Sequence, residues 1–409
     1  MSEPLLTASF SSRSPQLLPA RSLFWIQFAL ALGGFGIGTG EFVIMGLMPQ
    51  VAADLGVDEA GVGHLISAYA LGVVVGSPLL AVFGARLPRR VLLLVLMGCY
   101  AVGNIASTLA TDYNWLMLFR FLSGFPHGTY FGVAALVAAS IVPEEHRARA
   151  VSHVLVGLTI ALLIGNPLAT WLGQMLDWRM AFGLVSVISI ATMVMITALV
   201  PDTDDGEPVN PLQELRAFAN WDVWLSLLLG ATGFAGVFCV FSYLAPTLLE
   251  FTGVSAIWIP ITMALFGAGA IVGNLLGGWL YDRLRFDSVG VFLLMTLVLL
   301  LIFPTAAGWL PSVLVMYFLI GTVLGLSPAV QTHLMSVATG AQTLAAASNH
   351  AAFNCANALG PLLGGMVIGF GFGWQSTGYT GAVMALVGLG FYWLARRRLV
   401  GTDALPVPA

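Results

Sequence analysis

Apolar residues gather in twelve stretches of about 20 residues, separated by short polar segments or by glycine and proline. A helix of that length crosses the roughly 30 Å hydrocarbon layer of a membrane. The pattern therefore predicts an all-α membrane protein with twelve transmembrane helices. The predicted helices start near Ser22, Ala60, Val91, Asn114, Val151, Met180, Trp221, Ser255, Ser288, Pro311, Leu344 and Ser376.

The longest polar stretch inside the chain separates the first six predicted spans from the last six. It covers residues 201–220 and is expected to hold a short surface helix at 211–218. The first apolar run is longer than the roughly 7 to 15 residues of a cleavable signal, so the N-terminus is predicted to stay as a tail. The predicted parts are a cytoplasmic tail at 1–21, a six-helix bundle at 22–200, a cytoplasmic linker at 201–220, a six-helix bundle at 221–395 and a cytoplasmic tail at 396–409.

The two halves carry matching segments that contain glycine together with proline or charged residues. Gly84-Ala-Arg-Leu-Pro-Arg-Arg90 and Gly278-Trp-Leu-Tyr-Asp-Arg283 each lie between apolar stretches, with Ala85 and Asp282 offset by 197 (282 − 85). Gly165-Asn-Pro167 and Gly360-Pro-Leu-Leu-Gly-Gly365 each lie inside an apolar stretch, with their prolines offset by 194 (361 − 167). The halves are therefore expected to be pseudo-symmetric, a duplication typical of transporters, whose sites form where the halves meet.

Composition and charge agree with a membrane location. The chain is 58% hydrophobic and 8% charged, and all fifteen basic residues are arginine. In the twelve-span topology, Arg179 alone falls on the outer side and Arg120 alone falls inside a span, so the positive-inside rule predicts that both termini are cytoplasmic. The thirteen arginines on the inner side are Arg13, Arg21, Arg86, Arg89, Arg90, Arg147, Arg149, Arg216, Arg283, Arg285, Arg396, Arg397 and Arg398.

The residues that are absent exclude several classes of protein. Without lysine there is no P-loop and no Schiff-base enzyme, and the chain contains no G-x-S-x-G, H-E-x-x-H or C-x-x-C. We therefore expect no enzyme activity, no cofactor and no metal, and transport energy from an ion gradient or the substrate's own gradient. A net charge of −4 with dispersed arginines predicts no nucleic-acid partner.

Four segments carry a family resemblance: Gly40-Glu-Phe-Val-Ile-Met-Gly46, His64-Leu-Ile-Ser-Ala-Tyr-Ala-Leu-Gly-Val-Val-Val-Gly76, Ser123-Gly-Phe-Pro-His-Gly128 and Asn354-Cys-Ala-Asn-Ala-Leu-Gly360. From about Trp25 to Arg398 the sequence resembles the twelve-spanner drug:proton antiporter branch of the major facilitator superfamily. It is most similar there to bacterial arabinose-efflux and chloramphenicol-efflux permeases. The resemblance implies two bundles around a central small-molecule site, in the bacterial inner membrane, with a monomer as the default.

The resemblance also implies gating residues, which depart from the family text in the first half. Asp282 and Arg283 keep the cytoplasmic signature of acid and base, whereas Ala85 and Pro88 replace the expected acid and second glycine. The arginines beside them, Arg86, Arg89 and Arg90, either set only the topology or pair across the bundle interface and gate the cytoplasmic side.

Glycine and proline inside spans supply candidate pivots. Gly165 and Pro167 match the family's fifth-helix antiporter signature, although Asn166 intrudes, and Gly360 and Pro361 form the second copy. Proline kinks a helix and glycine permits close packing. Both residues are also common in membrane helices generally, which is the alternative explanation.

Only one acid and one arginine lie inside the predicted spans, Glu41 and Arg120. Each costs roughly 2.5 to 3.5 kcal/mol near the bilayer centre, which indicates a purpose. In the family, the acid of helix 1 takes part in proton coupling. We therefore expect Glu41 to carry the proton, Arg120 to tune it, and His64 or His127 to relay the proton or bind substrate. The alternative is a static Glu41–Arg120 pair that only neutralises itself.

Polar and aromatic stripes in other spans supply candidate substrate contacts. The stripe of helix 11 must face protein or water, because lipid would not tolerate it, and it serves either packing or the substrate path. The aromatic stripe of helix 7 fits a flat drug or the apolar face of a sugar, or else only packs. The substrate-binding candidates are His127, Phe238, Tyr243, Gln331, Asn354 and Asn357.

The sequence thus predicts a secondary active transporter that exports a small molecule in exchange for protons by alternating access. Proton entry supplies roughly 2.3 kcal/mol per charge per 100 mV, besides the pH difference. The alternatives are a proton-coupled or facilitative importer, and a non-transporting receptor, sensor or membrane-embedded enzyme of the same fold. Sugars such as arabinose, chloramphenicol-like drugs and purine-type metabolites all remain open as substrates.

Overall fold

The computed structural model describes residues 19–84, 86–143, 146–202, 220–338 and 342–403, which contain helices and no strand. The surface helix expected at 211–218 lies outside these ranges. The first half consists of α1 (Ala20–Gly46), α2 (Met48–Leu55), α3 (Glu59–Gly84), α4 (Arg89–Thr108), α5 (Tyr113–Gly124), α6 (Pro126–Ser140), α7 (Arg147–Ile160), the π-helical turn η2 (Ala161–Gly165), α8 (Asn166–Met175) and α9 (Arg179–Leu199).

The second half repeats this plan. It consists of α11 (Trp221–Phe241), α12 (Leu244–Pro246), the π-helical turn η4 (Thr247–Phe251), α13 (Trp258–Leu284), α14 (Asp287–Ala306), α15 (Leu310–Thr322), the 3₁₀ turn η5 (Val323–Gly325), α16 (Leu326–Val337), α17 (Gln342–Gly369) and α18 (Ser376–Asp403).

Eleven of the twelve predicted spans are long and apolar enough, within the described ranges, to cross a membrane. The span predicted from Asn114 forms two shorter helices instead, α5 and α6, with Phe125 between them. Pro126 opens α6, and a proline lacks the N–H that would continue the hydrogen bonding of the preceding turn. The twelfth crossing and the cytoplasmic orientation of the termini stay predictions.

Four other spans are interrupted shortly before a proline. In one of them the 3₁₀ turn η5 separates α15 from α16, and Pro328 follows within α16. In the other three, Leu47 separates α1 from α2, Ser242 and Tyr243 separate α11 from α12, and η2 separates α7 from α8. Pro49, Pro246 and Pro167 follow within these short or restarted helices. Of the two predicted pivots, Gly165–Pro167 therefore lies at a real irregularity, whereas Gly360 and Pro361 lie inside the continuous helix α17.

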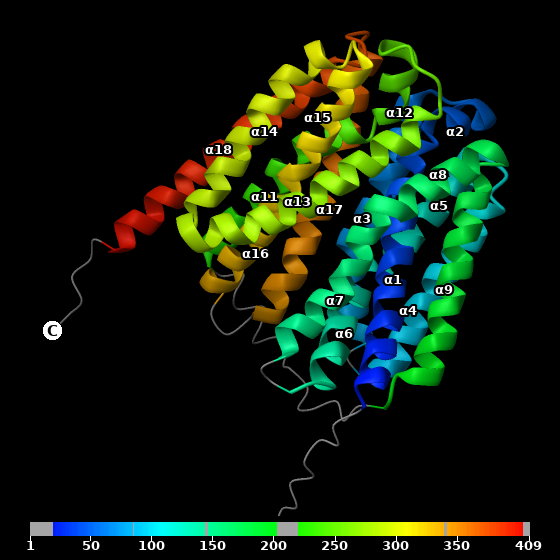
Figure 1. Ribbon diagram of the computed structural model, residues 1–409, viewed down its shortest axis with the longest axis vertical. Helices are drawn as coiled ribbons and strands as arrows, with labels where there is room; N and C mark the ends of the chain where they lie inside the picture. Colours follow the sequence, from blue (N-terminus) through cyan, green and yellow to red (C-terminus); the bar gives the residue numbers. More distant parts are fainter. Residues whose placement is uncertain (1–18, 85, 144–145, 203–219, 339–341, 404–409) are drawn as a thin grey trace, which may run out of the picture.

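The two halves form two bundles that meet at one edge (Figure 1). We call the edge that carries α2 and α12 the far edge, and the edge where α1 begins and α9 ends the terminal edge. The bundles touch along α3 and α17, and along α13 with η2 and α8. They diverge toward the terminal edge, where α7 and α16 lie apart in the view of Figure 1. This arrangement is the one expected of a transporter closed at the far edge.

The ends of the second bundle are held by ion pairs. Arg396 pairs with Asp287 of α14 at 2.9 Å, and Arg398 pairs with Asp222 of α11 at 2.8 Å. Helix α18 accordingly continues past residue 395, the predicted end of the bundle, and runs to Asp403.

Gly360 permits the closest approach of α17 to α11. A Cβ atom added there would lie 2.7 Å from the backbone carbonyl carbon of Phe238, a contact that requires the helices to shift. Overpacking of this kind costs about 1 to 3 kcal/mol. We expect Gly360→Ala to lower the midpoint of thermal unfolding in detergent by several degrees.

Gly369, in the last turn of the same helix, is the matched control, because a Cβ atom added there meets nothing within 4 Å. Equal unfolding midpoints for Gly360→Ala and Gly369→Ala would contradict the close packing of α11 and α17.

Candidate functional site at the bundle interface

Glu41 of α1 is buried where the two bundles meet, with 1% of its surface exposed. Its Oε1 atom accepts a hydrogen bond of 2.9 Å from Nδ2 of Asn357, which belongs to α17 of the other bundle. Its Oε2 atom is buried without a hydrogen-bond partner and lies 4.0 Å from Nδ1 of His127. The carboxyl group therefore joins the bundles through one oxygen and keeps the other available.

Arg120 of α5 is completely buried beside Glu41 but contacts its backbone. The guanidinium donates to the carbonyl oxygens of Gly40 at 2.7 Å and of Glu41 at 3.3 Å. It also lies over the ring of Tyr69, 4.4 Å from the centroid, an attractive cation–π geometry. The ion pairs among the described residues do not include Arg120 with the Glu41 carboxylate, so this conformation lacks the static pair considered as an alternative.

His127 of α6 is the histidine that faces this carboxyl group. Its Nδ1 atom is hydrogen-bonded at 3.0 Å to the hydroxyl of Tyr69, which projects from α3. Beyond it, the ring of Phe131 stacks on His350 of α17 at 5.7 Å between centroids and 4° between planes. We call Glu41, Tyr69, Arg120, His127 and Asn357 the interface cluster, and it draws residues from α1, α3, α5, α6 and α17.

The sequence pattern selected His64 on α3 rather than Tyr69. His64 is exposed, and no contact described here joins it to Glu41, whereas Tyr69 is buried in the cluster. Five residues separate the two, a spacing that places them on different faces of a helix. Both residues lie within the segment 64–76 that carries the family resemblance, so the resemblance does not choose between them, and the helix face that packs on the cluster does.

Asn354 and Gln331 bond near the cluster but not to it. Asn354 donates to the carbonyl of His350 in its own helix at 3.0 Å, and its Oδ1 atom is buried without a partner. Gln331 of α16 accepts from Asn349 at 3.4 Å. These amides give α16 and α17 a polar face close to the His350 ring.

Phe238 and Tyr243 pack the far edge. The ring of Phe238 stacks on Phe42 of the first bundle at 6.0 Å between centroids and 7° between planes. The Tyr243 hydroxyl donates to the carbonyl of Pro361 at 2.7 Å. Phe238 thus contacts the first bundle, whereas the hydrogen bond of Tyr243 lies within the second bundle.

The predicted gating charges lie toward the terminal edge. Arg90 pairs with Asp202, at the end of its own bundle, at 3.1 Å. Arg86 is exposed and Arg89 is partly buried. Asp282 and Arg283 are both exposed, and Arg283 covers the indole of Trp279 at 3.8 Å.

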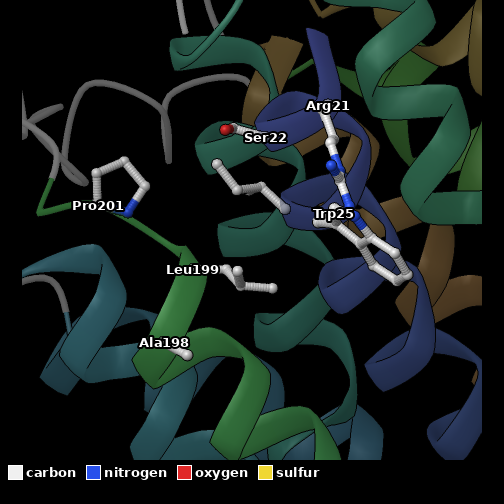
Figure 2. Close-up of a pocket in the computed structure, with 7 residues that line it drawn as sticks. Arg21, Ser22, Trp25, Ala198, Leu199 and Pro201 are labelled. Atoms are coloured by element: carbon white, nitrogen blue, oxygen red, sulfur yellow. The ribbon is translucent and has the colours of Figure 1, made fainter. Parts of the chain in front are cut away.

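The cavity drawn in Figure 2 is separate from the interface cluster. It measures about 350 Å³ and lies at the terminal edge, between the first turns of α1 and the end of α9. Its lining contains no predicted site residue and consists of Arg21, Ser22, Trp25, Ile26, Ala198, Leu199 and Pro201. Within the part of the chain that the structure describes, no group of three or more His, Cys, Asp or Glu could hold a metal.

The hydrogen bond between Asn357 and Glu41 can be tested by comparing two asparagines of α17, Asn357 and Asn354. We expect Asn357→Ala to destabilise the protein by about 1 to 3 kcal/mol, because it leaves a buried carboxyl group without its partner. Asn354→Ala, three residues earlier and equally buried, removes only a bond within its own helix and should cost less. Reversible unfolding in a denaturant series measures both variants, and equal losses would refute the bridging role.

Comparison with known proteins agrees with this geometry. Residues 30–349 match the model of the Major Facilitator Superfamily. The chain is 36% identical to the inner membrane transport protein YdhP of Escherichia coli (strain K12), over 90% of this chain and 95% of that protein. It is 31% identical to the chloramphenicol resistance protein of Streptomyces lividans, over 93% and 98% of the two chains.

A solved structure shares the fold. The bacterial homologue of the human lysosomal transporter Spinster, in an inward-facing and unoccupied conformation, matches with a TM-score of 0.75 and 18% identity, over 96% of this chain and all of that one. The chain therefore belongs to the major facilitator superfamily and is a multi-pass transporter of the bacterial inner membrane, not an enzyme.

Proposed function

We propose that this transporter, working as a monomer, exports a small molecule in exchange for protons by alternating access. The observation that carries the proposal is the Glu41 carboxyl group, buried at the bundle interface with one oxygen bonded to Asn357 and the other free. An ionisable group at such a depth is costly and typically marks an ion or proton pathway.

The position of Glu41 links its proton to the movement of the bundles. Closing the far edge removes Glu41 from water, and burying a charged carboxylate costs far more than burying a neutral carboxyl group. A proton bound from the outer side therefore favours closure, in which Asn357 bonds to Oε1. Once the bundles diverge at the terminal edge, the proton leaves toward the cytoplasm through that side.

Arg120 contributes by donating hydrogen bonds to the backbone around Glu41. Its two hydrogen bonds fix the carbonyls of Gly40 and Glu41, so the carboxyl group points at the other bundle rather than at the guanidinium. Any shift of α1 against α5 would move this positive charge relative to the carboxyl group and alter its affinity for a proton. His127 lies next to Oε2, as the first polar side chain on the way to His350.

The substrate proposed is an uncharged molecule with a ring face and a few hydrogen-bonding groups. The rings of Phe131, His350 and Phe353 offer flat surfaces, and buried oxygens of Asn354 and Asn357 offer unused acceptors. A sugar such as arabinose or a drug such as chloramphenicol fits this description. The similarity to a chloramphenicol resistance protein supports the drug class, and the resemblance to arabinose-efflux permeases supports the sugar class.

Movement between conformations requires pivots, and we propose the glycine and proline pairs of α7–α8 and α17 for this role. Gly165 lies in the π-helical turn η2 and Pro167 in the first turn of α8, which packs on α13 of the other bundle. At the terminal edge, we propose that Arg86, Arg89, Arg90, Asp282 and Arg283 latch the bundles when that edge closes.

Flux in proteoliposomes tests the proposal, with labelled arabinose and chloramphenicol offered in parallel under an imposed pH gradient. We expect gradient-driven flux of one compound, and a loss of at least about tenfold in Glu41→Gln, because an amide cannot bind and release the proton.

Exchange of labelled for unlabelled substrate without a gradient should survive in Glu41→Gln. Glu59→Gln, which changes an acid in the first turn of α3, should behave as the unaltered protein. Gradient-driven flux that persists in Glu41→Gln with the same pH dependence would refute proton carriage by Glu41.

A further inference from the structure

The far edge carries the same contact twice, once in each bundle. Nε1 of Trp178 donates to Oδ2 of Asp54 at 3.2 Å, and Nε1 of Trp374 donates to Oε2 of Glu250 at 2.9 Å. In both, the tryptophan follows the acid by 124 residues (178 − 54 and 374 − 250), and the two contacts are offset by 196 (250 − 54). That offset agrees with the repeat of the sequence, so the contact is a duplicated feature of the fold.

Each contact ties the same two parts of its bundle together. Asp54 lies in α2, which continues α1 beyond the interruption at Leu47, and Glu250 lies in η4, which continues α11 beyond Ser242 and Tyr243. Trp178 immediately precedes α9, and Trp374 lies just before α18. The extension of the first helix of each bundle is thus attached to the start of its last helix. We call α2 and α12–η4 the outer segments, and the two contacts the clamps.

The outer segments form part of the closed far edge. Helix α12 contacts both α1 and α2 of the other bundle. Met48 and Val51 of α2 and Leu244 and Leu248 of the other segment are all buried. A segment that follows a helix interruption can swing unless something holds it, and the clamp supplies that attachment within its own bundle.

The two clamps differ in the acid, which is Asp54 in the first and Glu250 in the second, and in the residue that follows the tryptophan. Arg179 pairs with Asp54 at 2.7 Å and covers the indole of Trp178 at 4.3 Å, so the first clamp contains an ion pair as well as the indole bond. The equivalent position in the second half is Gln375 (179 + 196). Arg179 is the arginine that the twelve-span topology places on the outer side, and the clamp gives that exception a local reason.

We infer that the two clamps make each outer segment move with its own bundle, so that the far edge opens and closes as two rigid parts. Asp54, Trp178, Glu250 and Trp374 are positioning residues in this scheme. They lie away from the interface cluster, and the inference does not depend on proton coupling by Glu41.

The inference predicts how removal of an indole N–H changes the equilibrium between open and closed far edges. Trp374→Phe keeps a ring but removes the donor, and should raise the fraction of molecules with an open far edge by about two- to tenfold. Trp178→Phe should have a smaller effect, because the pair of Arg179 with Asp54 still holds α2.

The measurement is a distance distribution between spin labels on the full chain in nanodiscs. Cysteines introduced at Thr111 and Gly308, both exposed in connections between helices at the far edge, report opening once Cys99, Cys239 and Cys355 have been replaced. Trp171→Phe, an exposed tryptophan of α8, is the control and should leave the distribution unchanged.

A double-mutant cycle separates a clamp from general surface packing. Glu250→Ala should reproduce Trp374→Phe, and the double variant should be no more open than either single one. Glu250→Gln, whose amide oxygen still accepts from the indole, should restore the closed population. All variants should keep unfolding midpoints within a few degrees of the parent. An unchanged distance distribution in Trp374→Phe, or additive effects in the double variant, would overturn the inference.

Discussion

A buried carboxyl group whose hydrogen-bond partner belongs to the opposite bundle is the constraint on which the interface depends. Glu41 cannot be satisfied by its own helix, whose backbone is already bonded, and Arg120 is occupied by the carbonyls of Gly40 and Glu41. Asn357 supplies the bond only while α1 and α17 are adjacent. The hydrogen bonding of this one side chain therefore depends on the relative position of the two bundles.

The rest of the far edge supports that adjacency with contacts of ordinary kinds. Ser67 donates to the carbonyl of Ala358 at 2.8 Å, and the ring of Phe42 stacks on Phe238. Gly360 lets α17 lie against α11, and this packing sets where Asn357 stands. These contacts are apolar or neutral, so they separate at little electrostatic cost. The ionisable exception is the Glu41 carboxyl group, and the proposed proton coupling depends on this difference.

Duplication explains the shared plan of the bundles, and divergence explains their different roles. The acid is in the first half and its amide partner in the second, although both halves keep interrupted first helices and indole clamps. The cytoplasmic signature retains Asp282 but has Ala85 at the equivalent position, while the far edge has Arg179 opposite Gln375. In two places, then, one half keeps a charge that the other has lost, and the molecule is symmetric in shape but not in electrostatics.

The sequence by itself determined the apolar spans, the two-bundle plan and the embedded position of Glu41 and Arg120, because run length, repeat offset and a charge inside an apolar run are local properties. Eleven of the spans agree with the structure, and the interruption before Pro126 also has a local cause, which is the proline itself. Tertiary structure decided the pairing. It showed that Arg120 holds backbone rather than the carboxylate, that Tyr69 and not His64 faces the cluster, and that Asn357 bonds to Glu41 across 316 residues. Such pairings depend on which helix faces meet, and that follows from packing across the whole molecule rather than from any one segment.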